Sequence, residues 1–186
     1  MDLNYDDEGA GMFVTNVGLI TSKGEKGDGI MSAAWTYQIS YSPALMAVCI
    51  NPRHTTYKNI VKSKEFGISI ASTKQNSLAS LSGGYSGKDY DKIGALKEIG
   101  YKFFKAKKIN VLLVEGASLN IECKLIKKVK LGDHVLLVGE IVECSPAKGE
   151  SLVYYKGEYW NVKPHHKPDD SERKEFKAVF EKHRIK

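Results

Sequence analysis

The sequence lacks any long apolar run. No stretch of its 186 residues approaches the ~20 consecutive apolar residues that a membrane-spanning helix needs. Its first residues include Asp2, Asp6, Asp7 and Glu8, and no apolar segment of a secretory leader accompanies them. We therefore expect a cytoplasmic protein that has no membrane as a partner.

Cysteine is scarce, and its spacing excludes the common cysteine-based sites. Cys49, Cys123 and Cys144 are far apart, and none belongs to a CxxC pair. Each lies in an apolar, strand-like run, which favours buried free thiols over a disulfide or a zinc site. We expect no metal.

Several catalytic signatures are also missing. The chain has no Gly-x-Ser-x-Gly elbow, no HExxH motif and no Rossmann fingerprint. The segment 82–89, SGGYSGKD, fails as a phosphate-binding P-loop. Ser82 stands where the motif needs its first glycine, and Asp89 follows Lys88 where Ser or Thr is needed. We assign no residue a catalytic role as acid, base or nucleophile.

Negative charge is in the minority, and the formal net charge is +6. Such an excess is compatible with a nucleic-acid partner, or with solvated lysines together with a site for an anionic ligand. Aromatic residues do not interleave with the lysines of 105–108 and 124–130. This favours the second interpretation, and we expect no nucleic acid.

Short β-rich runs separated by turn residues dominate what is present. The expected strands cover 12–21, 29–39, 45–50, 66–71, 101–106, 111–115, 117–130, 134–144, 152–155 and 159–162. Helices are expected at 56–64, where Thr55 or Thr56 can cap, at about 73–81, and in the tail. Because strands do not alternate strictly with helices, the pattern predicts a mainly β fold, a β-barrel with short helices. We expect a single domain over 1–186, with 1–11 as a loose lead-in and 164–186 as a helical tail.

The segment 117–130 shows the clearest alternation. Leu119, Ile121 and Cys123 fall on one face, and Asn120 and Glu122 on the other. The following Gly-Asp pair at 132–133 indicates a tight hairpin into the next strand.

The stretch 29–64 is the strongest candidate for a ligand site. A run of small residues at 32–34 would let a flat ligand approach the backbone, and Trp35 follows it. The sequence Arg53-His54-Thr55-Thr56 comes just before an expected helix, whose free N–H groups attract anions. These features suit a planar ring joined to a phosphate. In the alternative interpretation, Trp35 is a core residue, the threonines only cap the helix and Arg53 faces water.

The order of these and later segments resembles the flavin reductase-like, FMN-binding split-barrel family, and within it the flavoredoxin-like branch. The segments that carry the resemblance span about 12–162: VTNVGLITSKG, IMSAAWTYQISYSPALMAVCI, RHTTYKNIVKSKEFGISI, YDKIGA, SLNIECKLIKKVKLGDHVLLVGEIVEC and YYKGEYW. Each is short, and their order and spacing together are what is specific.

The resemblance implies a six-stranded, Greek-key-like barrel that forms a homodimer and holds FMN near the dimer interface. The implied cofactor-binding residues are Met31, Ser32, Ala33, Ala34 and Trp35 along the ring and ribityl chain, Arg53, His54, Thr55 and Thr56 at the phosphate, Lys92 near the ring, and His134 with Trp160 or Tyr159 approaching from elsewhere in the dimer. Many relatives have Asn where this chain has Gly29, so one hydrogen bond to the ring is in doubt.

The implied activity is that of an FMN-dependent oxidoreductase, a flavin reductase that uses NADH or NADPH and passes hydride or electrons through bound FMN. The alternative is a flavoredoxin-like electron-transfer flavoprotein that receives electrons from a redox partner protein and has no nicotinamide activity. The sequence leaves the choice between the nucleotides open.

Overall fold

The computed structural model describes residues 2–3, 7–147, 149–165 and 169–185. The helices are α1 (Glu8–Gly11), α2 (Thr55–Ser63), α3 (Asn76–Gly84), α4 (Lys92–Ile99) and α5 (Asp170–Lys182). The strands are β1 (Thr15–Asn16), β2 (Gly18–Gly24), β3 (Gly27–Ala33), β4 (Thr36–Tyr41), β5 (Ala44–Ile50), β6 (Glu65–Ile70), β7 (Phe103–Lys105), β8 (Leu112–Val114), β9 (Leu119–Leu131), β10 (His134–Pro146), β11 (Leu152–Tyr155) and β12 (Glu158–Asn161). The expectation of a mainly β fold with short helices is confirmed.

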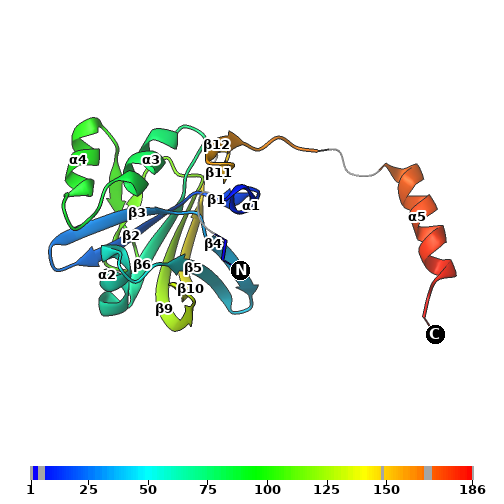
Figure 1. Ribbon diagram of the computed structural model, residues 1–186, viewed down its shortest axis with the longest axis horizontal. Helices are drawn as coiled ribbons and strands as arrows, with labels where there is room; N and C mark the ends of the chain where they lie inside the picture. Colours follow the sequence, from blue (N-terminus) through cyan, green and yellow to red (C-terminus); the bar gives the residue numbers. More distant parts are fainter. Residues whose placement is uncertain (1, 4–6, 148, 166–168, 186) are drawn as a thin grey trace.

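A seven-stranded antiparallel sheet forms the body of the protein, in the order β3-β2-β6-β9-β10-β5-β4 (Figure 1). β3 and β4 stand at opposite ends of this order, yet only residues 34–35 join them. The sheet therefore has to curl until its two edges approach each other. Smaller sheets of β1-β11-β12 and β7-β8 complete the β structure.

The break between β3 and β4 corrects the expectation of one strand over 29–39. Thr36 Oγ1 donates to the carbonyl of Ala33 at 3.0 Å, and the backbone N–H of Thr36 donates to the carbonyl of Ala34 at 3.0 Å. These local hydrogen bonds turn the chain and end the β3 ladder. As a consequence, residues 31–33 belong to the edge strand β3, whereas Ala34 and Trp35 lie in the connection that leads to the other edge, β4.

The central part of the sheet is buried on both faces. On one face, Ile20, Ile68 and Leu137 pack beneath Ile60 of α2. On the other, Leu19 and its neighbours pack against α3, α4 and β8, with Leu78 of α3 in the cluster. Successive residues of β2 thus enter different cores, which explains its continuous apolar run.

The polar face of β9 departs from the expected alternation. Asn120 and Glu122 are buried, because the segment from β7 to β8 covers them. Both oxygens of the Glu122 carboxylate accept backbone N–H groups, from Lys107 at 2.8 Å and Lys108 at 2.6 Å. Hydrogen bonds from the covering loop therefore replace the water that this face would otherwise contact.

The three cysteines are free, as expected, but they are not all buried. Cys123 is buried, Cys49 is half-buried and Cys144 is exposed. Cys144 lies beyond the register shift of β10 between Ile141 and Glu143, near the end of the strand.

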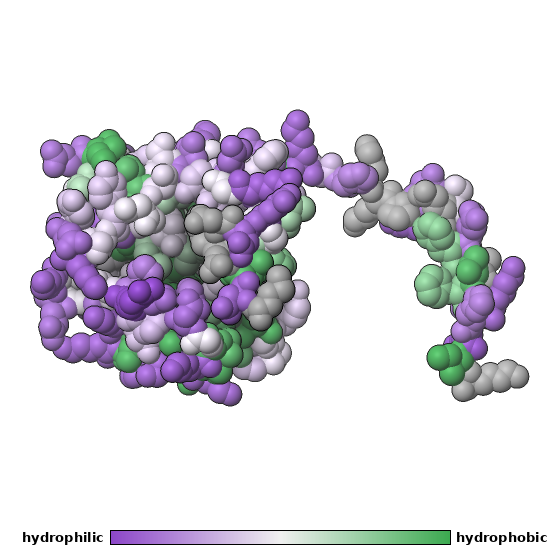
Figure 2. Space-filling model, viewed as in Figure 1, coloured by the Kyte–Doolittle hydropathy of each residue, from purple (hydrophilic) through white to green (hydrophobic). Residues whose placement is uncertain are grey.

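The N-terminal segment holds one short helix, whereas the C-terminal segment holds a longer helix that stands apart from the body. The expected lead-in contains the short helix α1, and its residues 1 and 4–6 lie outside the described residues. The expected tail helix is present as α5, which stands apart from the body (Figure 1), while residues 166–168 and 186 are not described. Apolar side chains gather along one side of α5 (Figure 2), among them the exposed Phe176 and Phe180. Within the described ranges, no helix is long and apolar enough to cross a bilayer.

Candidate functional site

A cavity of about 810 Å³ opens where β3, the start of α2, the end of α3 and the β11–β12 hairpin meet. We call it the central cavity, and Figure 2 shows the hollowed face of the molecule. It is lined by Asn16, Val17, Met31, Ser32, Ala33, Ala34, Arg53, His54, Thr55, Thr56, Ala79, Ser80, Ser82, Gly83, Gly84, Tyr85, Ser86, Gly87, Lys88, Lys92, Tyr154 and Tyr159. All the predicted site residues except Trp35, His134 and Trp160 are in this lining.

One end of the central cavity is cationic. Arg53, His54, Lys88 and Lys92 line it, and no Asp or Glu is among the lining residues. Partial burial lowers the pKa of His54, and the charges of Lys92, His134, Arg53 and Lys88 lower it further. A cluster of positive groups without a carboxylate partner attracts an anionic ligand.

The first turn of α2 contributes to this cationic end. The N-cap of α2 is His54, with φ −71° and ψ 142°, and its side chain makes no capping hydrogen bond. The expectation that Thr55 or Thr56 caps the helix is wrong, because both residues lie inside its first turn. Backbone N–H groups at such a helix start, together with the threonine hydroxyls, form a site for a phosphate or another anion.

Arg53 is held in place by Asn51, the residue that follows β5. Its Nε donates to Asn51 Oδ1 at 3.2 Å, and its backbone N–H donates to the same oxygen at 3.1 Å. Asn51 is itself buried. These contacts engage one edge of the guanidinium and restrict how the rest of it can turn.

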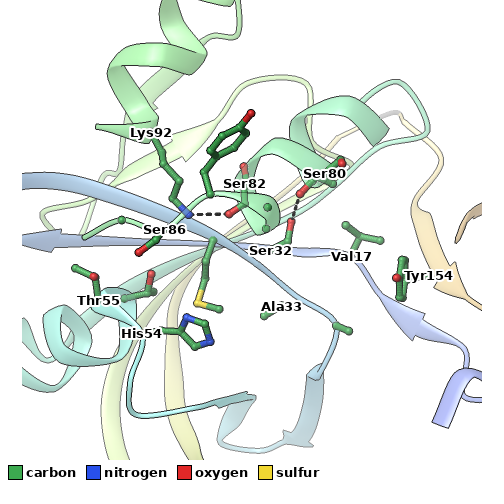
Figure 3. A pocket seen from close by; sticks show the side chains of 18 of the residues that line it. Val17, Ser32, Ala33, His54, Thr55, Ser80, Ser82, Ser86, Lys92 and Tyr154 are labelled. Carbon is green, nitrogen blue, oxygen red and sulfur yellow. Dashed lines mark hydrogen bonds between the residues drawn. The ribbon is translucent and has the colours of Figure 1, made fainter. Parts of the chain in front are cut away.

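Lys92 stands at the same end of the cavity, opposite His54 and Thr55 (Figure 3). Its Nζ donates to the carbonyl of Ser82 at 2.7 Å, and burial lowers its pKa to about 8. A Cβ placed on Gly87 would lie 3.6 Å from Thr55 Cβ and 4.0 Å from Lys92 Cε. The loop after α3 therefore lies beside both groups.

The wall beside this end is made of small residues. Ser32 Oγ donates to the carbonyl of Ala79 at 2.6 Å, which ties β3 to α3. A Cβ on Gly83 would lie 3.4 Å from Ser32 Cβ, so the helix end lies very close to the strand. Ser82 Oγ is buried in the lining and has no hydrogen-bond partner among the described residues. Such a wall suits a flat ligand with polar groups along one edge.

The opposite end of the cavity is aromatic. Val17 and Tyr154 lie there, across Ser32 and Ala33 from the cationic end (Figure 3). Tyr154 and Tyr159 meet edge to face with ring centroids 5.5 Å apart. The cavity thus runs from a cationic end, along a small-residue wall, to an aromatic end.

Three predicted residues, and Gly29, lie elsewhere. The ring of Trp35 contacts that of His134 with centroids 4.9 Å apart, and His134 lines a separate hollow. Trp160 Nε1 donates to the carbonyl of Tyr155 at 2.9 Å. Gly29 is outside the lining, and a Cβ there would meet Asn59 and Ser22, each at 3.4 Å.

The segment 82–88, which comprises the end of α3 and the start of the loop after it, is the main part of the site that sequence reasoning missed. Its sequence does not satisfy the P-loop spacing, yet the structure brings every one of its residues to the cavity. Its run of Gly and Ser, which allows close backbone approach, is the signal that could have identified it. Asn16 and Tyr154 come from distant parts of the chain, and no local pattern marks them.

The residues present fit a flavin nucleotide, whose phosphate would take the cationic end and whose ring would lie toward the aromatic end. The fit depends on the absence of carboxylates from the lining and on the partnerless hydroxyl of Ser82. Among the described residues, no group of three or more His, Cys, Asp or Glu side chains could hold a metal ion.

Comparisons with known proteins agree with this fit. The family described as "Flavin reductase like domain" matches residues 10–163. An uncharacterised protein of Pyrococcus abyssi is 32% identical over 61% of this chain and 63% of its own length, so the chain spans less than two thirds of that relative. The FMN reductase (NADH) RutF of Pseudomonas syringae is 26% identical over 83% of this chain and 81% of its own.

A solved structure shows the same fold. Flavoredoxin from Methanosarcina acetivorans superposes with a TM-score of 0.77 at 17% identity, covering 95% of this chain and 98% of the other. Because the family description matches most of the chain, the expected relationship is confirmed. The chain belongs to the flavin reductase-like domain family.

Proposed function

We propose that the protein is an FMN-dependent flavin reductase that takes its electrons from NADH or NADPH. The observation that supports this most is the central cavity, where Arg53, Lys88 and Lys92 stand with His54 and without a carboxylate at one end of a small-residue wall. The relative RutF, named as an NADH-dependent FMN reductase, supports the same reaction class.

The cationic end would hold the FMN phosphate. Arg53 and the hydroxyls of Thr55 and Thr56 would donate to its oxygens, and the N–H groups of the first turn of α2 would add to the site. Lys92 was expected beside the ring. Its place next to Thr55 and Gly87 supports a role at the phosphate instead, where Lys88 would join it.

The small-residue wall would orient the rest of the cofactor. Residues 31–34 would follow the ribityl chain and the ring, and Tyr154 would exclude water from the far end. When bound, FMN supplies hydride acceptance at its N5 atom and one- or two-electron transfer. The chain binds, positions and shields, and no side chain is required as a general base for that step.

We further propose that the protein is a homodimer and that Trp35 and His134 reach a flavin only in this dimer. Each chain would be a single, cytoplasmic domain whose curled sheet forms a split barrel. Tyr37, Ile39 and Tyr41 alternate along the edge strand β4, Trp35 directly precedes that strand, and all four side chains are exposed. An apolar, exposed edge strand favours pairing between chains. Light scattering should give a dimer mass, and Ile39→Lys should lower it to a monomer while the control Gln38→Lys does not. A monomeric native protein would contradict the dimer.

Anaerobic titration tests the function. The purified protein, loaded with FMN, should lose its visible flavin absorbance when either NADH or NADPH is added in slight excess. Absence of FMN binding would refute the cofactor assignment. Stable FMN binding without bleaching by either nucleotide would indicate an electron-transfer flavoprotein instead, and bleaching by dithionite is the control that the bound flavin is reducible.

A further inference from the structure

A second hollow, of about 570 Å³, lies next to the central cavity. We call it the lysine hollow. Pro52, Tyr57, Lys128, Lys130, Asp133 and His134 are among its lining residues. Lys128, Lys130 and His134 are basic, and Asp133 is the one acidic residue in the lining.

The lysine hollow adjoins the cationic end of the central cavity. Pro52 lines the hollow and the next residue, Arg53, lines the cavity. The charge of Arg53 helps to lower the pKa of Asp133, and that of His134 helps to lower the pKa of His54, so the groups of the two sites lie within electrostatic reach. A long ligand can therefore extend from one site into the other.

The two lysines share a side of the β9–β10 hairpin. Lys128 pairs with Leu137 and Lys130 with Val135 in the antiparallel register. Residues two apart on a strand point to the same face. The two lysines therefore lie on one face of the hairpin, beside the buried Leu137 and Val135. Both lysine side chains are exposed.

One oxygen of the single carboxylate in the lysine hollow is engaged by a neighbouring side chain. Asp133 Oδ1 accepts from His134 Nδ1 at 2.8 Å. This matters because a site that prefers NADH commonly offers a carboxylate to the adenosine 2′-hydroxyl, whereas a site that prefers NADPH offers a basic group to the 2′-phosphate. Lys128 and Lys130 supply the second kind of chemistry.

From the proposed function, on which this inference rests, we propose that the lysine hollow binds the adenosine 2′-phosphate of NADPH, with Lys128 and Lys130 as specificity-determining residues. If the nicotinamide lies toward the aromatic end of the central cavity, the rest of the dinucleotide runs along the flavin toward the cationic end. The dinucleotide is longer than FMN, so its adenosine half continues past the cationic end and into the adjoining hollow. NADPH is then the preferred electron donor.

Steady-state kinetics of the FMN-loaded protein test this preference. We expect a higher kcat/KM for NADPH than for NADH. The double variant Lys128→Ala/Lys130→Ala should lose about tenfold or more in kcat/KM for NADPH, because each charge-assisted hydrogen bond is worth on the order of tenfold in affinity. The kcat/KM for NADH should change less than about twofold on the same scale.

The matched control is Lys127→Ala. Lys127 is exposed on the same strand, points to the opposite face and is not in the lining. It should leave the NADPH-to-NADH ratio unchanged, which separates a local contact from a general loss of positive charge. Retained FMN affinity in all three proteins shows that they fold, since neither lysine lines the central cavity.

Calorimetric titration with adenosine 2′,5′-bisphosphate and with AMP gives an independent measurement. The bisphosphate should bind more tightly than AMP, and the double variant should abolish the difference. An unchanged NADPH-to-NADH ratio in the double variant, or equal binding of the two probes by the native protein, would overturn the proposal. If neither nucleotide reduces the flavin, the proposed function fails, and the probe titration alone then decides whether the 2′-phosphate site exists.

Discussion

At the scale of single residues, the affinity of the site for an anion depends on basic side chains that lack a carboxylate partner. Arg53 is positioned by an amide, Asn51, and Lys92 by a backbone carbonyl, that of Ser82. Neither contact neutralises the cation, so both charges stay available to a ligand. Lys92 is the more informative of the two, because its protonation changes within an accessible pH range.

The first prediction concerns the pH dependence of FMN binding. With a pKa of about 8 in the free protein, Lys92 is cationic below that pH and loses its proton above it. Phosphate binding favours the cation, so above pH 8 binding takes up a proton and FMN affinity should fall, by up to about tenfold per pH unit. Fluorescence titration between pH 7 and pH 9.5 measures this slope.

Lys92→Met supplies the comparison. The variant should bind FMN about tenfold more weakly at pH 7, because a charge-assisted hydrogen bond is lost, and its affinity should be flat across the alkaline range. Lys97→Met is the control, since Lys97 is exposed on the same helix and does not line the cavity. An alkaline slope that persists in Lys92→Met would assign the titration to another group.

At the scale of elements, close packing inside the curled sheet depends on residues without side chains. Gly139 in β10 sits at a register shift against β9, directly beneath the ring of Phe66. A Cβ there would clash with the Phe66 ring and would lie only 2.8 Å from Cys123 Cβ. The bulge and the aromatic ring thus share a space that excludes even a methyl group.

The second prediction follows from this contact. Gly139→Ala should lower the free energy of unfolding by about 1–3 kcal/mol, the usual cost of overpacking a core. Urea denaturation followed by circular dichroism measures the change. Gly84→Ala is the control, because a Cβ there meets nothing within 4 Å, and it should leave stability nearly unchanged. Equal midpoints for the two variants would show that the sheet relaxes around the added methyl.

At the scale of the whole molecule, the folded body and the C-terminal arm are separate. The family match ends at residue 163, and α5 begins at Asp170, away from the body (Figure 1). The arm's described side chains, such as Val179 and Phe180, are exposed. Among the residues that the structure describes, the arm (164–186) therefore buries no apolar side chain against the domain.

The third prediction is that removal of residues 164–186 leaves the domain intact. The shortened chain should keep its FMN affinity, and its Tm should change by less than about 2 °C, which for a domain of this size corresponds to under 1 kcal/mol. Differential scanning fluorimetry with and without FMN measures both. A much larger fall in Tm would mean that the arm packs against a folded surface, either in its own chain or in a partner.

The sequence by itself determined the features that depend on neighbours along the chain. The β-rich runs, the Gly-Asp turn before His134 and the cationic start of α2 at Arg53 could all be predicted, because periodicity, turn chemistry and helix termini are local. The same locality explains the errors. Thr55 or Thr56 was predicted to cap α2, but His54 does. One strand was predicted through Trp35, but the chain turns there.

Only the tertiary structure decided which distant segments meet. The curl of the sheet places segment 82–88 against α2, buries Glu122 beneath the loop after β7, and turns Trp35 away from the central cavity. It also brings Lys130 beside Pro52. These arrangements depend on contacts between residues far apart in sequence, and no periodicity within one segment encodes them.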